Sequence, residues 1–234
     1  MIIYLKILQY KKIMAFIISV EGNIGSGKST FLKYLKENSD LVTQTLKHPV
    51  VFVQEPVDEW NNIKDAAGES IIQKFYSNQE EYAFSFQIMA YITRLRKLME
   101  AIEKNPSSIV ICERSLETDK YVFAKMLYDS KKIREIDWVI YNYWFDTFLE
   151  KVKTDLIIYI NTEPEICNER IIKRSRKGEE GIPLEYLQNC HKYHTSWLDA
   201  VTIPIIIFKG QMDINENSYK LSTERILTSI KESI

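Results

Sequence analysis

Short apolar runs alternate with longer helical patterns along this chain of 234 residues. Short apolar runs of this kind predict strands, and the continuous run from Phe16 to Val20 is typical of a strand that is buried on both faces of a sheet. Five such runs predict strands at Phe16 to Val20, Val50 to Val53, Ile109 to Cys112, Leu156 to Ile160 and Ile205 to Phe208. Their alternation with helical segments is the pattern of repeated βαβ units.

Longer segments with helical periodicity lie between the predicted strands. They predict helices at about Lys28 to Lys36, near Gln79 to Lys104, twice across Asp119 to Lys151, after Pro164, after Pro183 and at Asn217 to Ser233. Because crossovers between parallel strands are almost always right-handed, these helices should cover both faces of the sheet. The sequence therefore predicts an α/β fold with a five-stranded parallel sheet.

The first 13 residues stand apart from this pattern. Lys6 interrupts their apolar run, no small-residue cleavage site follows, and the run is far too short to span a membrane. The segment also contains no Arg and no Ser, so it lacks the composition of a mitochondrial transit peptide. We expect residues 1–13 to be a dispensable extension, with Met14 as the start of a single domain over residues 14–234.

The charge balance bears on which partners the protein binds, and the cysteines bear on the cellular compartment. There are 31 basic and 32 acidic residues, for a net charge of −1, whereas a duplex-binding protein more often carries a basic excess. We expect neither nucleic acid nor a membrane among the partners. Cys112, Cys167 and Cys190 are widely spaced and include no CxxC pair, which indicates reduced thiols in a cytosolic or nuclear setting, and we expect a cytoplasmic protein.

The segment from Gly22 to Ser29, GNIGSGKS, matches the phosphate-binding pattern G-x-x-x-x-G-K-[ST] at every fixed position. It follows a predicted strand and opens a helix, the context in which such a loop holds phosphates on its backbone N–H groups. Lys28 is expected to reach the β- and γ-phosphates of ATP or another nucleoside triphosphate, and Ser29 to help hold Mg²⁺. The expected donor site comprises Gly22, Asn23, Ile24, Gly25, Ser26, Gly27, Lys28, Ser29 and Thr30.

Charged side chains follow two of the predicted strands. Glu55 comes just after the second strand, and Glu113 and Arg114 follow the third. Open α/β sheets build their sites at the carboxyl ends of the strands. One carboxylate there can take the proton of an acceptor hydroxyl and the other can support the metal, while Arg114 steadies the charge on the transferred group. Each carboxylate alone would be interpreted as a solvated strand-end charge, and the phosphate-binding loop makes a catalytic role the favoured interpretation.

Five motifs occur in a fixed order: EGNIGSGKST, QEPVDEW, FSFQIMAYITR, CERSLETDKYVF and RSRKGEEGIPLEYL. In order and spacing they resemble the deoxyribonucleoside kinases, a family that includes deoxycytidine and deoxyguanosine kinases, mitochondrial thymidine kinase and an insect multisubstrate enzyme. The resemblance covers nearly everything from Phe16 onward and implies a phosphate-loop kinase fold with a lid. It also implies a homodimer and salvage of a deoxynucleoside by transfer of the ATP γ-phosphate to its 5′-hydroxyl, with Mg²⁺. By this resemblance Glu55 is the general base, Arg114 lies beside the hydroxyl, and Glu113 supports the metal.

The resemblance also implies an acceptor pocket. Phe86 and Gln87 match the pair that recognises the base, and the Gln87 amide offers the base both a donor and an acceptor. The other matches are Trp60 and Phe123, the aromatic walls around the base, and Tyr76 and Glu179, which bind the sugar 3′-hydroxyl. Without the resemblance, aromatic residues of this kind would be interpreted as ordinary core.

Three positions bear on the choice of base. Ala90, Arg94 and Asp119 match the branch of the family that accepts deoxycytidine and purine deoxynucleosides. Gln87 and Arg94 are seven residues apart on a predicted helix and therefore share a face. An Arg94–Asp119 pair over the base would crowd the 5-methyl group of thymine. We expect deoxyadenosine, deoxyguanosine or deoxycytidine to be favoured over thymidine, and the alternative is an ordinary structural salt bridge.

Arg170, Arg174 and Arg176 precede a glycine-punctuated segment and resemble the lid of the family, which closes over the phosphates. The spacing of Arg170 and Arg174 puts them on one helical face, where a solvated basic face is the alternative. Closure would exclude water, so that the nucleoside accepts the phosphate. Gly210 to Asn215 weakly resembles the donor-base loop, without assignable roles. Lys120 departs from the arginine that many members carry beside the pocket aspartate.

Two other classes of protein that carry a phosphate-binding loop are alternatives. A nucleoside monophosphate kinase of the thymidylate type would need basic groups for its extra phosphate where this chain has Glu55. A catalytically silent nucleotide-binding subunit would be expected to lose Lys28, Glu55 or Arg114, and all three are intact. The intact residues favour a deoxynucleoside kinase.

Overall fold

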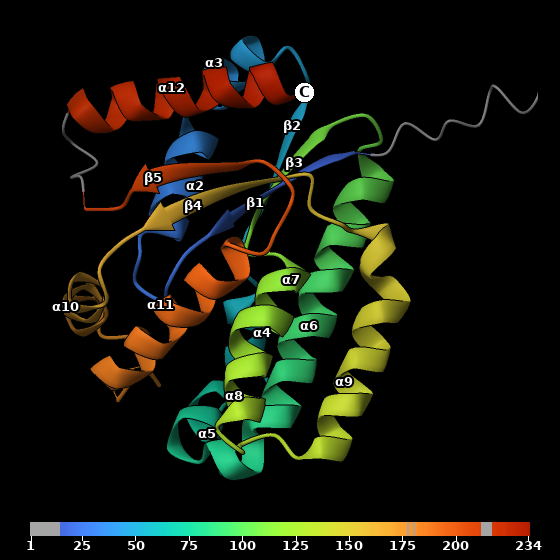
Figure 1. Cartoon of the computed structure of the whole chain (residues 1–234), viewed down its shortest axis with the longest axis vertical. Helices are drawn as coiled ribbons and strands as arrows, with labels where there is room; N and C mark the ends of the chain where they lie inside the picture. Colours follow the sequence, from blue (N-terminus) through green and yellow to red (C-terminus); the bar gives the residue numbers. More distant parts are fainter. Residues whose placement is uncertain (1–14, 177, 180, 212–216) are drawn as a thin grey trace, which may run out of the picture.

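The computed structural model describes residues 15–176, 178–179, 181–211 and 217–234 (Figure 1). Five parallel strands form one sheet in the order β2-β3-β1-β4-β5. The strands are β1 (Phe16–Glu21), β2 (Val50–Val53), β3 (Ile109–Glu113), β4 (Leu156–Asn161) and β5 (Ile205–Lys209). The five predicted strands and their parallel arrangement are confirmed.

Helices cover both faces of the sheet, as predicted. They are α2 (Lys28–Glu37), α3 (Ser39–Leu46), α4 (Val57–Asn62), α5 (Ile71–Ser77), α6 (Gln79–Lys104), α7 (Leu116–Thr118), α8 (Lys125–Asp129), α9 (Glu135–Phe148), α10 (Pro164–Arg174), α11 (Leu184–Leu198) and α12 (Asn217–Ser233). A π-helical segment (Asp119–Ala124) joins α7 to α8, and a 3-10 helix (Leu149–Lys151) follows α9. Figure 1 shows α3 and α12 on one side of the sheet and α6 and α9 on the other. Across the described ranges, no helix combines the length and the apolar character that a bilayer span requires.

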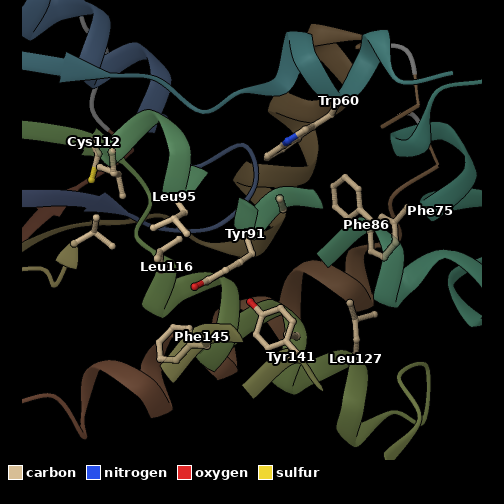
Figure 2. Close-up of a cluster of buried hydrophobic side chains, with 14 of the residues drawn as sticks. Trp60, Phe75, Phe86, Tyr91, Leu95, Cys112, Leu116, Leu127, Tyr141 and Phe145 are labelled. Atoms are coloured by element: carbon tan, nitrogen blue, oxygen red, sulfur yellow. The ribbon is translucent and has the colours of Figure 1, made fainter. Parts of the chain in front are cut away.

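Alternation of side chains along the strands divides the core between the two faces. In β1, Ile18 and Val20 pack in the cluster that includes residues of α2, α3 and α12, whereas Ile17 packs in the cluster of α6 and α9. Successive side chains of a strand point to opposite faces, so a strand that is covered on both sides carries apolar side chains on each face. Around α6 the core is aromatic, and the rings of Phe75 and Phe86 stack with centroids 4.5 Å apart (Figure 2).

The sheet register gathers the strand ends that carry the predicted site. Val20 of β1 pairs with Glu113 of β3, and Val53 of β2 pairs with Cys112 of β3. Because all the strands are parallel, the loops that leave β1, β2 and β3 emerge at the same edge. The phosphate-binding segment, Glu55 and Glu113 therefore share one end of the sheet.

Four short helices, α3, α4, α5 and α7, have no counterpart among the predicted elements. They have eight, six, seven and three residues, too few for a helical periodicity to be recognised in the sequence. Between Asp119 and Lys151, where two helices are predicted, α8 and α9 are accompanied by the π-helical segment and the 3-10 helix. The predicted extension over residues 1–13, and Met14, lie outside the described residues.

Candidate active site

A cavity of about 610 Å³ opens where the strands end. Of the residues predicted for the site, its lining contains Ile24, Gly25, Ser26, Gly27, Lys28, Ser29, Thr30, Glu55, Trp60, Tyr76, Phe86, Gln87, Arg94, Glu113, Arg114, Asp119, Phe123, Arg170, Arg174, Arg176 and Glu179. The other two, Gly22 and Asn23, are buried, and their carbonyl oxygens accept hydrogen bonds from Arg114 and Lys28. The predicted donor, metal and acceptor residues are thus gathered around one cavity.

The loop between β1 and α2 requires glycine at two positions. Gly22 and Gly25 have φ angles of +142° and +78°, in the left-handed region that favours glycine. A Cβ atom would lie 2.6 Å from the Ile160 carbonyl oxygen at Gly22 and 2.5 Å from the Cys167 carbonyl oxygen at Gly25. The loop leads into the start of α2, where unpaired backbone N–H groups favour an anion.

Lys28 is 5% exposed, and its Nζ donates a hydrogen bond to the Asn23 carbonyl oxygen at 2.7 Å. Burial and the neighbouring Arg114 lower the pKa of Lys28 to about 8, against the opposing attraction of Glu113 and Glu55. A phosphate group beside this side chain would favour its protonated form. Whether the Lys28 side chain is protonated, and so available to pair with a phosphate, therefore depends on what occupies the loop.

Ser29 and Glu113 meet beside the loop. The Ser29 hydroxyl donates to Oε1 of Glu113 at 2.6 Å. Ser29 belongs to the first turn of α2 and Glu113 ends β3, so a helix start and a strand end each supply an oxygen. Mg²⁺ in nucleotide sites commonly takes one or two protein oxygens and completes its shell with phosphate and water. The Ser29–Glu113 pair fits such an ion.

Glu55 lies between two guanidinium groups. Its Oε1 accepts a hydrogen bond from Nη2 of Arg94 at 2.9 Å and lies 3.3 Å from Nε of Arg114. Burial opposes ionisation of this carboxyl, but the two arginines outweigh burial and lower the pKa of Glu55 to about 2. The side chain is 18% exposed and lines the cavity. Glu55 is therefore an ionised carboxylate available to a hydrogen-bond donor in the cavity.

Arg94 joins Glu55 to a second buried carboxylate. Its Nε and Nη2 donate to the two carboxylate oxygens of Asp119 at 2.8 and 3.2 Å, and its Nη1 donates to the Glu113 carbonyl oxygen at 2.8 Å. The Arg94 and Asp119 side chains are each 3% exposed. Burial raises the pKa of Asp119, against the opposing effect of Arg94. The anticipated Arg94–Asp119 pair is present, and it extends to Glu55.

Asp119 opens the π-helical segment that joins α7 to α8. Wide turns of this kind inside helices are often found at functional sites. The segment supplies both Asp119 and Phe123 to the cavity lining. The Phe123 ring centroid lies 4.7 Å from the guanidinium carbon of Arg114, a cation–π contact.

Trp60 of α4 and Phe86 of α6 both line the cavity, and Figure 2 shows the two side chains within the buried cluster. Their ring centroids are 5.5 Å apart and their planes meet at 79°. The Trp60 indole N–H donates to Oγ1 of Thr93 at 2.8 Å, which fixes the ring. Gln87 is 2% exposed, and its Oε1 has no hydrogen-bond partner among the described residues. A buried amide oxygen of this kind would be satisfied by an N–H group of a ligand.

Glu179 binds two of the predicted lid arginines. Nη1 of Arg176 donates to its Oε1 at 3.1 Å, and Nη2 of Arg174 donates to its Oε2. Arg170, on α10, donates instead to the Ser26 carbonyl oxygen at 3.1 Å. The residue predicted to bind the sugar is therefore tied to two of the residues predicted to bind phosphate.

Some cavity residues were not predicted. They are Val57, Ile72, Phe75, Ile160, Tyr186, Phe208 and Tyr219, whereas Ala90, which lines the cavity too, is one of the positions predicted to bear on the choice of base. These apolar and aromatic residues carry no signal that separates them from the core, and the same holds for Thr93, the partner of Trp60. The predicted donor-base loop, Gly210 to Asn215, contributes Gly210 and Gln211 to the cavity, and residues 212–215 lie outside the described residues.

The fold and the cavity define a phosphotransferase built on a phosphate-binding loop. A family model described as deoxynucleoside kinase matches residues 18–234. Deoxycytidine kinase 2 from Gallus gallus is 33% identical over 92% of this chain and 88% of its own length. Deoxycytidine kinase from Homo sapiens is 33% identical over 92% and 89%, and the mitochondrial deoxyguanosine kinase from Xenopus laevis is 31% identical over 86% and 83%. The chain therefore belongs to the deoxynucleoside kinase family of ATP-dependent phosphotransferases.

Proposed function

We propose that this chain transfers the ATP γ-phosphate to the 5′-hydroxyl of deoxyadenosine, deoxyguanosine or deoxycytidine in preference to thymidine, in nucleotide salvage. The position of Glu55 carries the proposal, because it lines the same cavity as Lys28 and lies between Arg94 and Arg114. A carboxylate at this point suits a hydroxyl acceptor, whereas it would repel an acceptor phosphate. Similarity to deoxycytidine and deoxyguanosine kinases supports this acceptor class.

Glu55 acts at the acceptor hydroxyl. With a pKa of about 2 it is ionised at neutral pH and orients the hydroxyl by accepting its hydrogen bond. The hydroxyl oxygen bonds the γ-phosphorus, the bond from that phosphorus to the β–γ bridging oxygen breaks, and the hydroxyl proton passes to Glu55. Because the transition state of phosphoryl transfer is loose, a well-placed weak base suffices, and Arg114 and Lys28 stabilise the charge on the transferred group.

The loop from Gly22 to Ser29, with Thr30, holds the triphosphate. Ser29 and Glu113 would hold Mg²⁺, and their 2.6 Å oxygen–oxygen contact supports a shared position for both ligands. A bound Mg²⁺ neutralises phosphate charge. Lys28, buried beside the loop, supplies the remaining positive charge at the β- and γ-phosphates.

Base selection is assigned to Gln87 and to the Arg94–Asp119 pair, between Trp60 and Phe123. The unpartnered Oε1 of Gln87 supports a role as acceptor for an N–H group of the base. Every base offers such a group, so discrimination falls to the ionic pair. The side chains of Arg94 and Asp119 are each 3% exposed and bind each other, so neither can move aside. A rigid pair over the base leaves little room for the thymine methyl group.

Tyr76 and Glu179 are assigned to the sugar 3′-hydroxyl, and Arg170, Arg174 and Arg176 to the phosphates through closure of the lid. The hydrogen bonds from Arg174 and Arg176 to Glu179 link the residue assigned to the sugar with two of the residues assigned to the phosphates. Phosphates of a bound donor would compete with Glu179 for the two guanidinium groups. Donor binding would then free Glu179 for the sugar, and closure would exclude water from the reaction.

A homodimer is proposed to form through α9. Its residues Ile136, Val139, Ile140 and Tyr143 follow helical spacing, and between 40% and 74% of the surface of each is exposed. Exposed apolar faces of this kind mark protein–protein contacts. The three cysteines are free, and free thiols without disulfides are typical of proteins in a reducing compartment, which supports our assignment to the cytoplasm.

An acceptor panel tests the proposal. The purified protein is given ATP and Mg²⁺ with each of the four deoxynucleosides and, separately, with each 5′-monophosphate. We expect deoxynucleosides to be phosphorylated, with a lower kcat/KM for thymidine than for the preferred acceptor. Phosphorylation of monophosphates alone would identify a nucleoside monophosphate kinase, and turnover of no acceptor would favour a silent nucleotide-binding subunit.

A further inference from the structure

Glu21, the last residue of β1, is a carboxylate with no exposed surface, and the mechanism above does not use it. Its Oε1 accepts a hydrogen bond from the backbone N–H of Ser115 at 2.9 Å. Its Oε2 has no hydrogen-bond partner among the described residues. Burying a carboxylate with so few partners is costly, so its presence calls for a specific role.

The Glu21 bond holds the backbone beside Arg114. Arg114 has a φ angle of +66°, in the left-handed region where a residue other than glycine is strained and must be held by its surroundings. Three consecutive residues hold it. The Val20 carbonyl oxygen accepts from the Arg114 N–H at 3.1 Å, Glu21 accepts from the Ser115 N–H, and the Gly22 carbonyl oxygen accepts from Nη1 of Arg114 at 2.9 Å.

The left-handed turn determines where the Arg114 guanidinium lies. In this conformation Nε of Arg114 is 3.3 Å from Oε1 of Glu55, and the Phe123 ring packs against the guanidinium. Without the bond from Ser115, the backbone at Arg114 could relax toward ordinary φ angles and turn the side chain away from these partners. Of the three holding groups, Glu21 alone acts through its side chain and can be changed without altering the others.

We propose that Glu21 is a positioning residue for phosphoryl transfer: its carboxylate locks the Arg114–Ser115 backbone in the left-handed turn that aims the Arg114 guanidinium at the transferred phosphate. This inference rests on the role proposed above for Arg114. Glu21 ends the strand that leads into the phosphate-binding loop, so the same strand positions both the loop and the Arg114 side chain. The donor loop and the charge-stabilising arginine are therefore held in a fixed position relative to each other.

Two substitutions with side chains of similar length distinguish the loss of the hydrogen-bond acceptor from a change in side-chain size. Glu21→Gln keeps an oxygen for the Ser115 N–H, and as a neutral and therefore weaker acceptor it is expected to keep kcat within about threefold of wild type. Glu21→Met removes the acceptor, and misplacement of Arg114 is expected to lower kcat by about 100-fold. The Kd for ATP, measured by titration calorimetry, should stay within about twofold in both variants, because the charge lost is not a phosphate ligand.

A double-mutant cycle with Arg114→Ala decides whether Glu21 acts through Arg114. We expect Glu21→Met to lower kcat no further in the Arg114→Ala background, whereas an equal further loss would overturn the inference. If Arg114→Ala itself leaves kcat unchanged, the proposed mechanism fails. If Arg114→Ala lowers kcat and a folded Glu21→Met does not, the inference alone fails. Should Glu21→Met not fold, Glu21→Gln still decides, because a folded Gln variant as slow as Arg114→Ala overturns the inference.

Discussion

Nη2 of Arg94 lies 2.9 Å from Oε1 of Glu55, so the arginine assigned to the base pocket also holds the carboxylate assigned to the acceptor hydroxyl. The same guanidinium binds both oxygens of Asp119. One ionic network therefore extends from the group assigned to the base to the group assigned to the reacting hydroxyl. Under the proposed function, a change in the base pocket alters the catalytic carboxylate as well.

Removing the buried ionic pair should admit thymidine. The double variant Arg94→Met with Asp119→Ala deletes both charges together and avoids leaving one of them buried and unpaired. We expect its ratio of thymidine to deoxycytidine kcat/KM to rise by about tenfold or more, because the thymine methyl group gains room. Steady-state kinetics with both acceptors measures the ratio. Any effect of the lost Arg94 on Glu55 acts on both acceptors and largely cancels.

The control for this experiment lies on the same helix. Arg96 of α6 is 57% exposed and binds Glu59 at the surface, so Arg96→Met should leave the acceptor ratio unchanged. An unchanged ratio in the Arg94–Asp119 variant, with the protein folded, would show that the pair is a structural salt bridge without a part in selection.

The pKa of Lys28 predicts how ATP binding depends on pH. In the protein without ATP the pKa of Lys28 is about 8, and bound phosphates raise that pKa because they favour the ammonium form. ATP therefore binds the protonated protein more tightly, and above pH 8 its Kd should rise by about tenfold per pH unit until the bound pKa is reached. Titration calorimetry from pH 7.5 upward measures this. Lys28→Met should bind ATP weakly with no such dependence, and a constant wild-type Kd to about pH 9.5 would contradict the prediction.

Much of the fold could be predicted because it is local in the sequence. Val50–Val53 and Gln79–Lys104 have the predicted bounds, since an apolar run and a long helical periodicity are each visible over the full length of the element. The pairing of Arg94 with Asp119 could also be anticipated from the predicted helix face and the family resemblance.

Other features depend on tertiary structure and could not be predicted. The bond between Arg94 and Glu55 joins residues 39 positions apart, and sheet order brings them together. The π-helical turn at Asp119 and the left-handed backbone of Arg114 could not be anticipated either, and at Arg114 the hydrogen bonds come from residues more than 90 positions away in the sequence. Local patterns do not record such constraints, because the same residues would form an ordinary helix or extended chain elsewhere.

The exposed apolar face of α9 predicts a homodimer that a single charge disrupts. Val139 is 57% exposed, and Val139→Lys would bury an unpaired ammonium in the contact. Light scattering after size exclusion should give about twice the chain mass of 27.6 kDa for the wild type and one chain mass for the variant. Ile207→Lys makes the same kind of change on β5 and should remain dimeric. A monomeric wild type at micromolar concentration would contradict the prediction.

The central claim is that Glu55 serves the 5′-hydroxyl of a deoxynucleoside, and the most direct test compares kcat of the wild type and Glu55→Gln with deoxycytidine, ATP and Mg²⁺. Glutamine keeps the shape and an oxygen for Arg94 but does not take up the hydroxyl proton. We predict that kcat falls by about 100-fold or more, with the fold and the Kd for ATP unchanged. Wild-type turnover in the Glu55→Gln variant would contradict the account.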